Sequence, residues 1–79
     1  MDNLQEVTKS VLFAMKRTNS LNLNAEDTAN DINNEFVNKH GLDVVIRGIR
    51  KGGMGYYGSQ KNINTSTIGD WIIKYLKEN

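Results

Sequence analysis

The residues of this chain that could bind a ligand gather in one stretch, RGIRKGGMGYYGSQK, from Arg47 to Lys61. Residues 53–58 spell G-x-G-x-x-G, a pattern whose backbone N–H groups can hold the phosphates of a nucleotide. A dinucleotide-binding motif also needs a helix that opens directly after the glycines and an acidic residue about 20 positions later. Here a strand is expected after the glycines, and only 21 residues follow Gly58. The flanking sequence therefore argues against a nucleotide-binding loop.

The same stretch combines positive charge with aromatic and flexible apolar side chains. Arginine and lysine can neutralise phosphates, and tyrosine can stack on bases. A methionine at a turn is an adaptable anchor for a protein partner. The candidate contacts with a protein or nucleic-acid partner are Arg47, Arg50, Lys51, Met54, Tyr56, Tyr57 and Lys61. Phe13 and Ile73 fall off the apolar faces of their predicted helices and are secondary candidates for contact with a protein.

Residue types that build catalytic and metal sites are scarce. The lack of cysteine excludes disulfides and Cys-based zinc sites, and the single His40 cannot form a histidine cluster. Asp27, Asp31 and Glu35 recur every four residues on one face of a predicted helix, but no second acidic element completes a cation site. No serine or threonine lies in a nucleophile motif. We therefore expect no enzymatic activity, no cofactor and no bound metal.

Helical periodicity and capping residues predict two helices before this stretch. The first spans about Asn3–Arg17, is capped by Asp2, and carries one apolar stripe. The second follows an N-cap at Asn24 and ends at His40, where Gly41 can adopt a positive φ.

After the second helix, the sequence pattern changes. The β-branched run Leu42–Arg50 predicts a strand, Lys51–Gly55 a turn and Tyr56–Ile63 a returning strand. A third helix then follows, with Asn64 or Thr67 as its cap. Its apolar face comprises Ile68, Trp71, Ile72, Tyr75 and Leu76.

The predicted fold is therefore a single small α+β domain over residues 1–79, in the order α-α-β-β-α. Three amphipathic helices pack with a glycine-rich β-hairpin, because two strands alone do not make a stable sheet. A chain of this length buries only about 60% of its unfolded surface. A homodimer is one way in which such a domain gains stability.

Charge and composition bear on location and partners. Acidic residues concentrate in residues 25–43, whereas residues 44–69 carry four cations and no acid. The N-terminus has no features of a targeting segment, and no apolar run approaches the roughly 20 residues that span a bilayer. We expect a cytoplasmic protein without membrane contact. The 11 Asn, 7 Lys and 7 Ile have A/T-rich codons, which suits a low-GC bacterium or its phages.

Small size, scarce catalytic groups and segregated charge favour a non-enzymatic intracellular binding protein. Such a protein would attach to another protein and modulate it, as phage- or plasmid-type inhibitors and adaptors do. The alternative is a nucleic-acid-binding regulator that uses the basic, tyrosine-containing hairpin 47–61.

Overall fold

The structure, a computed structural model, describes residues 3–78, and its regular secondary structure there is entirely helical. Its helices are α1 (Asn3–Arg17), α2 (Ala25–Ile32), α3 (Asn38–His40), α4 (Leu42–Gly53) and α5 (Thr65–Lys77). A π-helical turn, η1 (Asn33–Val37), joins α2 to α3 without a break. The described residues therefore form four helical rods and contain no strand. The predicted cap Asp2 lies outside them.

The predicted α+β fold with a β-hairpin is wrong. Residues 42–50, expected as a strand, belong to α4, and this helix runs through most of the expected turn to Gly53. Residues 56–63, expected as the returning strand, lie in the loop before α5. The β-branched run does suit a strand, but Val45, Ile49 and Gly52 are buried at the i, i+4, i+7 spacing of a helix face. Burial of that face overrides the local preference.

The glycines of α4 are packing residues rather than turn residues. A Cβ added to Gly52 would lie 1.9 Å from Cδ2 of Trp71 in α5. A Cβ on Gly53 would lie 3.1 Å from Cα of Ala14 in α1. Glycine in a helix interior costs about 0.5–1 kcal/mol relative to alanine, and here close contact with both neighbouring helices offsets that cost.

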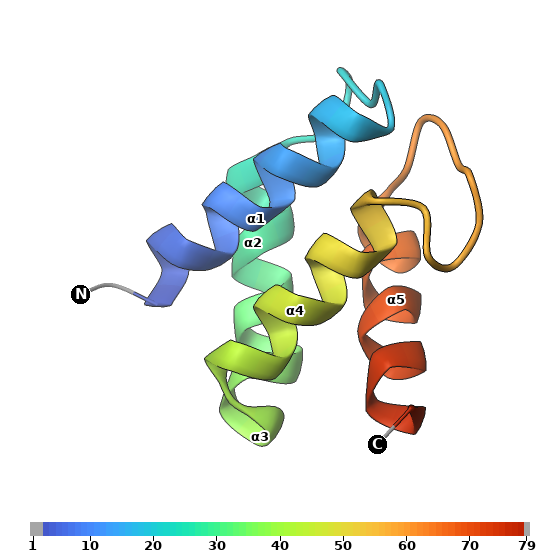
Figure 1. The fold of residues 1–79 in the computed structure, drawn as a ribbon. Helices are drawn as coiled ribbons and strands as arrows, with labels where there is room; N and C mark the ends of the chain where they lie inside the picture. The colour runs from blue at the N-terminus through green and yellow to red at the C-terminus, as the bar shows by residue number, and fades with distance from the viewer. Residues whose placement is uncertain (1–2, 79) are drawn as a thin grey trace.

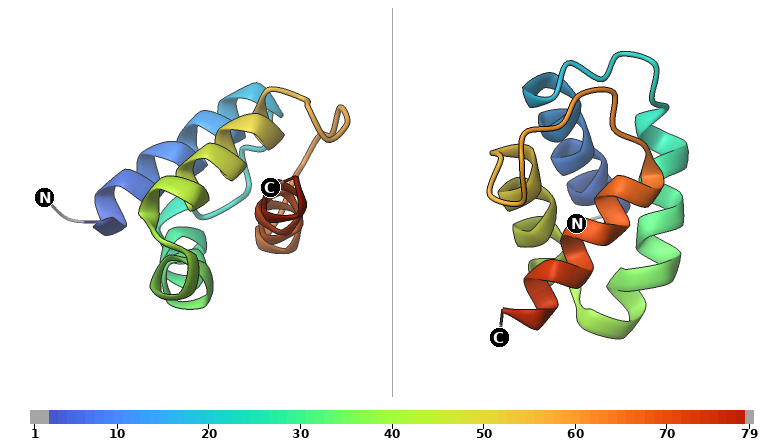
Figure 2. Two further views of the ribbon diagram at one scale, coloured as in Figure 1. Left: turned by 60° about the horizontal axis from the view of Figure 1, so that its bottom comes forward. Right: turned by 90° about the vertical axis from the view of Figure 1, so that its right-hand side faces the viewer.

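The helices form two layers. Figure 1 shows α1 and α4 side by side, running in the same direction and ending near each other. In Figure 2, left, this pair lies above the α2–α3 rod and α5. The core between the layers draws on all four rods and on the loop before α5. Its buried apolar residues are Val7, Val11, Ala14, Ala29, Ile32, Val37, Val45, Ile49, Ile63, Ile68, Trp71 and Ile72.

Several predicted boundaries are confirmed. The first helix has the expected bounds, and Gly41, at φ 92°, ends α3. The Asn24 side chain accepts a hydrogen bond from the backbone N–H of Asp27 and caps α2. Asn64, rather than Thr67, is the N-cap of α5, and it accepts from the Thr67 N–H at 2.9 Å. These signals are local, so they hold although the predicted fold class does not.

Candidate functional site

The loop that follows α4 is fastened to the body of the molecule before it reaches α5. We call residues 54–64 the strap. Its Ile63 is buried, and the Ile63 N–H donates to Ser20 Oγ at 2.7 Å. Ser20 Oγ in turn lies 2.7 Å from Thr18 Oγ1, in the connector between α1 and α2. The strap is therefore held against the end of α1.

Most of the predicted contact residues converge on one open groove beside the strap. Because residues 47–53 are helical, side chains at i, i+3, i+4 and i+7 share a face of α4 and its end. The groove measures about 450 Å³. Its lining residues, which define what we call the basic groove, are Arg47, Arg50, Lys51, Met54 and Tyr56, with Tyr75 and Glu78 from the end of α5.

Lys51 occupies the middle of a small aromatic and acidic cluster in the basic groove. Its Nζ lies 5.3 Å from the ring centroid of Tyr56 and 5.4 Å from that of Tyr75. Lys51 Nζ also donates to Glu78 Oε1 at 2.8 Å. The hydrogen bond to Glu78 is the main reason why the pKa of Lys51 is raised. The ammonium group is thus positioned by two rings and a carboxylate.

Glu78 joins the strap to α4 and α5. Its carboxylate accepts hydrogen bonds from Lys51 and from the Tyr57 hydroxyl, which lower the pKa of Glu78. Burial and Glu78 raise the pKa of Tyr57. Tyr57 is half-buried against the core, so this predicted contact residue fixes the strap and does not line the basic groove.

The arginines of this region differ in the side chains that they already contact. Arg47 Nη2 lies 3.3 Å from Asp43 Oδ2, and Tyr75 followed by Asp43 raises the pKa of Arg47. Arg50 instead lies over the ring of Phe13, with its Cζ 5.1 Å from the ring centroid. Arg17, at the end of α1, lies over the same ring at 5.1 Å. Among residues 3–78, no carboxylate lies within 4.0 Å of Arg50 or Arg17.

The two secondary candidates, Phe13 and Ile73, lie in different surroundings in the structure. Phe13, expected on the polar face of its helix, is half-buried: it supports the two arginines and contacts the end of α4 near Gly53. Ile73 is 41% exposed and, like Lys61, does not line the basic groove. Met54 and Tyr56 are the exposed apolar surface of the basic groove, at 60% and 65%.

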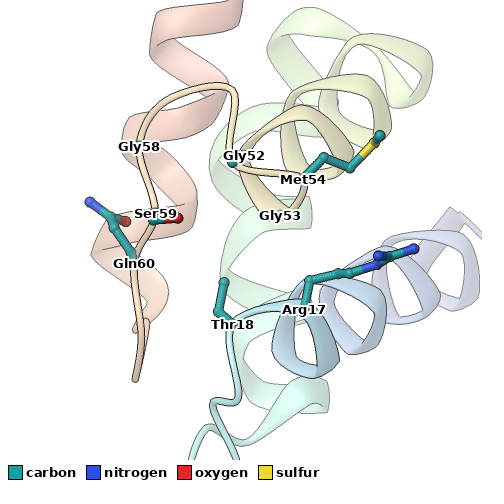
Figure 3. Close-up of a pocket in the computed structure, with 9 residues that line it drawn as sticks. Arg17, Thr18, Gly52, Gly53, Met54, Gly58, Ser59 and Gln60 are labelled. Carbon is teal, nitrogen blue, oxygen red and sulfur yellow. The ribbon is translucent and has the colours of Figure 1, made fainter.

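A second, smaller cavity adjoins the basic groove. It measures about 260 Å³ and lies between the ends of α1 and α4 and the strap. Met54 lines both hollows, and Figure 3 shows the side chains of Met54 and Arg17 extending to the same side, away from Ser59 and Gln60. The outer surface at this end of the molecule is therefore continuous from Arg17 to the basic groove.

The remaining polar candidates do not assemble into a reaction centre. Within residues 3–78, no three His, Asp or Glu side chains come together in an arrangement that could hold a metal ion. The acidic residues Asp27, Asp31 and Glu35 are exposed along α2 and η1. His40 is exposed, and its ring centroid lies 6.4 Å from that of Phe36.

Sequence reasoning missed Arg17, Tyr75 and Glu78 as members of this region. Tyr75 had been placed on the buried face of the last helix, and it is only half-buried. A helical reading of residues 42–53 would have grouped Arg47, Arg50 and Met54 on one face. Neither the place of Tyr75 in its helix nor a helical reading of residues 42–53, however, indicates that the ends of α1 and α5 lie beside the end of α4.

Comparisons with known proteins found no match to this chain among protein-family models, curated proteins or solved structures. None of the helices within residues 3–78 has the length and apolar character needed to cross a membrane. What the protein does must therefore be inferred from its own residues and their geometry.

Proposed function

We propose that this chain is a small, non-enzymatic cytoplasmic protein that attaches to another protein through the basic groove and modulates it. The observation that supports this most is the convergence of five predicted contact residues on one groove. Inhibitors and adaptors of the phage or plasmid type are the class of protein that this proposal favours.

The composition of the basic groove suits a protein partner. Tyrosine, methionine and arginine are enriched in the buried centres of protein interfaces, and tyrosine and arginine dominate their binding energy. Met54 and Tyr56 present apolar surface to solvent, while Arg50 and Lys51 are already held over aromatic rings. Side chains that are positioned before binding lose less conformational entropy when a partner arrives.

Nucleic acid is the second candidate, because Arg17 and Arg50 lie over the same Phe13 ring and have no carboxylate partner within residues 3–78. Two carboxylates weigh against it. Asp43 and Glu78 place negative charge beside Arg47 and Lys51. A phosphate backbone crossing this surface would meet each of these charges.

Affinity capture with a matched control tests the proposal. The full chain would be immobilised and incubated with nuclease-treated lysate of the source organism, beside a Met54→Ser/Tyr56→Ser variant and a Leu21→Ser control. Leu21 is 80% exposed and does not line the basic groove. We expect a stoichiometric protein to be retained by the wild type and the Leu21→Ser control and lost with the double variant.

Retention of the same protein by all three baits would place the contact elsewhere and contradict the proposal. A mobility-shift assay with the same variants covers the second candidate. Tight binding of nucleic acid, with a steep loss of affinity as salt rises, would favour it over a protein partner.

A further inference from the structure

Two guanidinium groups at the neighbouring ends of α1 and α4 are held in place over one aromatic ring. Arg17 and Arg50 both lie over the ring of Phe13, each with Cζ at 5.1 Å from its centroid. A guanidinium carries five N–H donors, and contact with a ring does not supply them with an oxygen acceptor. No carboxylate within residues 3–78 takes them up. By contrast, Arg47 and Lys51 already have carboxylate partners.

The charges around these two arginines select the kind of anion that fits. Asp43 lies beside Arg47, and Glu78 lies within the basic groove. A uniformly charged polymer would be repelled at each of these points, whereas isolated carboxylates could occupy the two free guanidinium groups alone.

Apolar surface adjoins the two free guanidinium groups. Met54 lines both the basic groove and the cavity that Arg17 lines. Tyr56 follows Met54 by two residues and is 65% exposed. A ligand bound to Arg17 and Arg50 therefore lies beside an exposed methionine and an exposed tyrosine.

We infer that the partner presents to this surface a short acidic segment, whose carboxylates bind Arg17 and Arg50 and whose apolar side chain packs on Met54 and Tyr56. This inference rests on the proposed function and specifies the partner's chemistry. Arginine and carboxylate match in a bidentate geometry, so two positioned guanidinium groups can select a segment with two carboxylates at a suitable spacing. The apolar anchor then supplies binding energy that a surface ion pair alone does not.

The test uses the full chain, labelled with ¹⁵N, and synthetic peptides as probes. One short peptide alternates Asp or Glu with Leu, and the second replaces each acid by the corresponding amide. We expect the acidic peptide to give saturable shifts in the side-chain N–H signals of Arg17 and Arg50 and in the amides of Met54 and Tyr56. The amide peptide should give shifts that are smaller and do not saturate.

Variants locate the binding energy. An Arg17→Gln/Arg50→Gln double variant should raise the Kd for the acidic peptide by about tenfold. Lys61→Gln removes one positive charge outside the basic groove and should leave the Kd within about twofold of the wild-type value. Arg50→Lys keeps the charge but loses the fork of donors, so its Kd should lie between those of the wild type and the double variant.

Three outcomes would overturn the inference: equal binding of both peptides, equal loss of affinity in the Lys61→Gln and double arginine variants, or tighter binding of duplex DNA than of the acidic peptide. Its failure can be separated from failure of the proposed function. If a captured protein still depends on Met54 and Tyr56 but not on Arg17 and Arg50, the proposed function stands and the acidic segment is wrong.

Discussion

At the scale of single residues, glycine decides how closely α4 approaches its neighbours. Gly52 rests directly on the indole of Trp71, and no larger residue fits between the two helices without a shift. Gly69 in α5 is different, because a Cβ there would meet Phe36 at 3.5 Å, an ordinary contact distance. A larger side chain at Gly52 would therefore disturb the packing of α4, whereas a methyl group at Gly69 would fit without a clash.

Gly52→Ala and Gly69→Ala should consequently change stability in opposite directions. Gly52→Ala should lower the free energy of unfolding by about 1–3 kcal/mol, the cost typical of overpacking a core. Gly69→Ala should raise it by up to about 1 kcal/mol, because alanine is the better helix former. Urea unfolding of both variants measures this. Equal effects would mean that α4 does not lie against Trp71 as described.

At the scale of elements, the strap depends on two anchors. At one end Tyr57 donates to Glu78, and at the other the Ile63 N–H donates to Ser20. The two anchors hold a loop with positive φ at Gly55 and Gly58 against the end of α5 and the connector after α1. The N–H groups of Met54 and Tyr56 donate to backbone carbonyls of α4, so these bonds and the two anchors together set the shape of the basic groove.

The Tyr57–Glu78 anchor predicts a stability effect with two pH limits. Hydrogen bonds from Lys51 first and Tyr57 second lower the pKa of Glu78 from its ordinary 4.5 in the folded state, so the stabilisation from these bonds is complete above pH 4.5 and is lost as pH falls through the folded value. The folded state also raises the pKa of Tyr57 above its ordinary 10.0, through burial first and the bond to Glu78 second. The stabilisation that depends on the neutral Tyr57 hydroxyl is therefore complete below pH 10 and is lost as pH rises. Wild type should therefore exceed Tyr57→Phe in stability most between these limits.

Chemical unfolding of the two proteins across the pH range measures this difference. Tyr56→Phe is the matched control, because it removes a hydroxyl from the neighbouring, exposed tyrosine and leaves the Tyr57–Glu78 hydrogen bond in place. A Tyr57→Phe difference that is constant from acid to alkaline pH would show that the Tyr57–Glu78 contact does not form in solution.

At the scale of the whole molecule, one chain closes its own core. Val7, Val11, Val45, Ile49 and Ile72 are each fully buried within residues 3–78. The two layers of helices leave the basic end of α1 and α4 and the acidic surface of α2 as separate parts of the surface. Folding and partner binding are therefore expected to depend on different residues.

If the core is complete in one chain, the midpoint of unfolding should not depend on protein concentration. Varying the concentration by about a hundredfold would shift the midpoint of an obligate dimer by mass action. We expect the same midpoint throughout that range, measured by circular dichroism and checked against the mass from sedimentation. A midpoint that rises with concentration would indicate that a homodimer, the other route to stability considered for this chain, completes the fold.

Prediction from sequence succeeded where the signal is carried by neighbouring residues. Asn24, Gly41 and Asn64 mark helix ends because capping depends on local backbone geometry and a side chain within a few residues. Residues 42–53 failed because two signals conflicted there: the β-branched side chains favour a strand, and the glycines suggested a turn. Both preferences are weaker than the gain from burying a whole helix face against α1 and α5.

The sequence by itself determined three of the helical segments, the helix ends at Asn24 and Gly41, and the residue types of the proposed contact surface. Only the tertiary structure decided that the glycines of α4 are contact points between helices and that Arg17, Tyr75 and Glu78 join the predicted residues. The physical reason is distance along the chain. Helix capping acts between near neighbours, whereas the fit of Gly52 against Trp71, and of Arg17 and Arg50 against Phe13, exists only after the helices have packed.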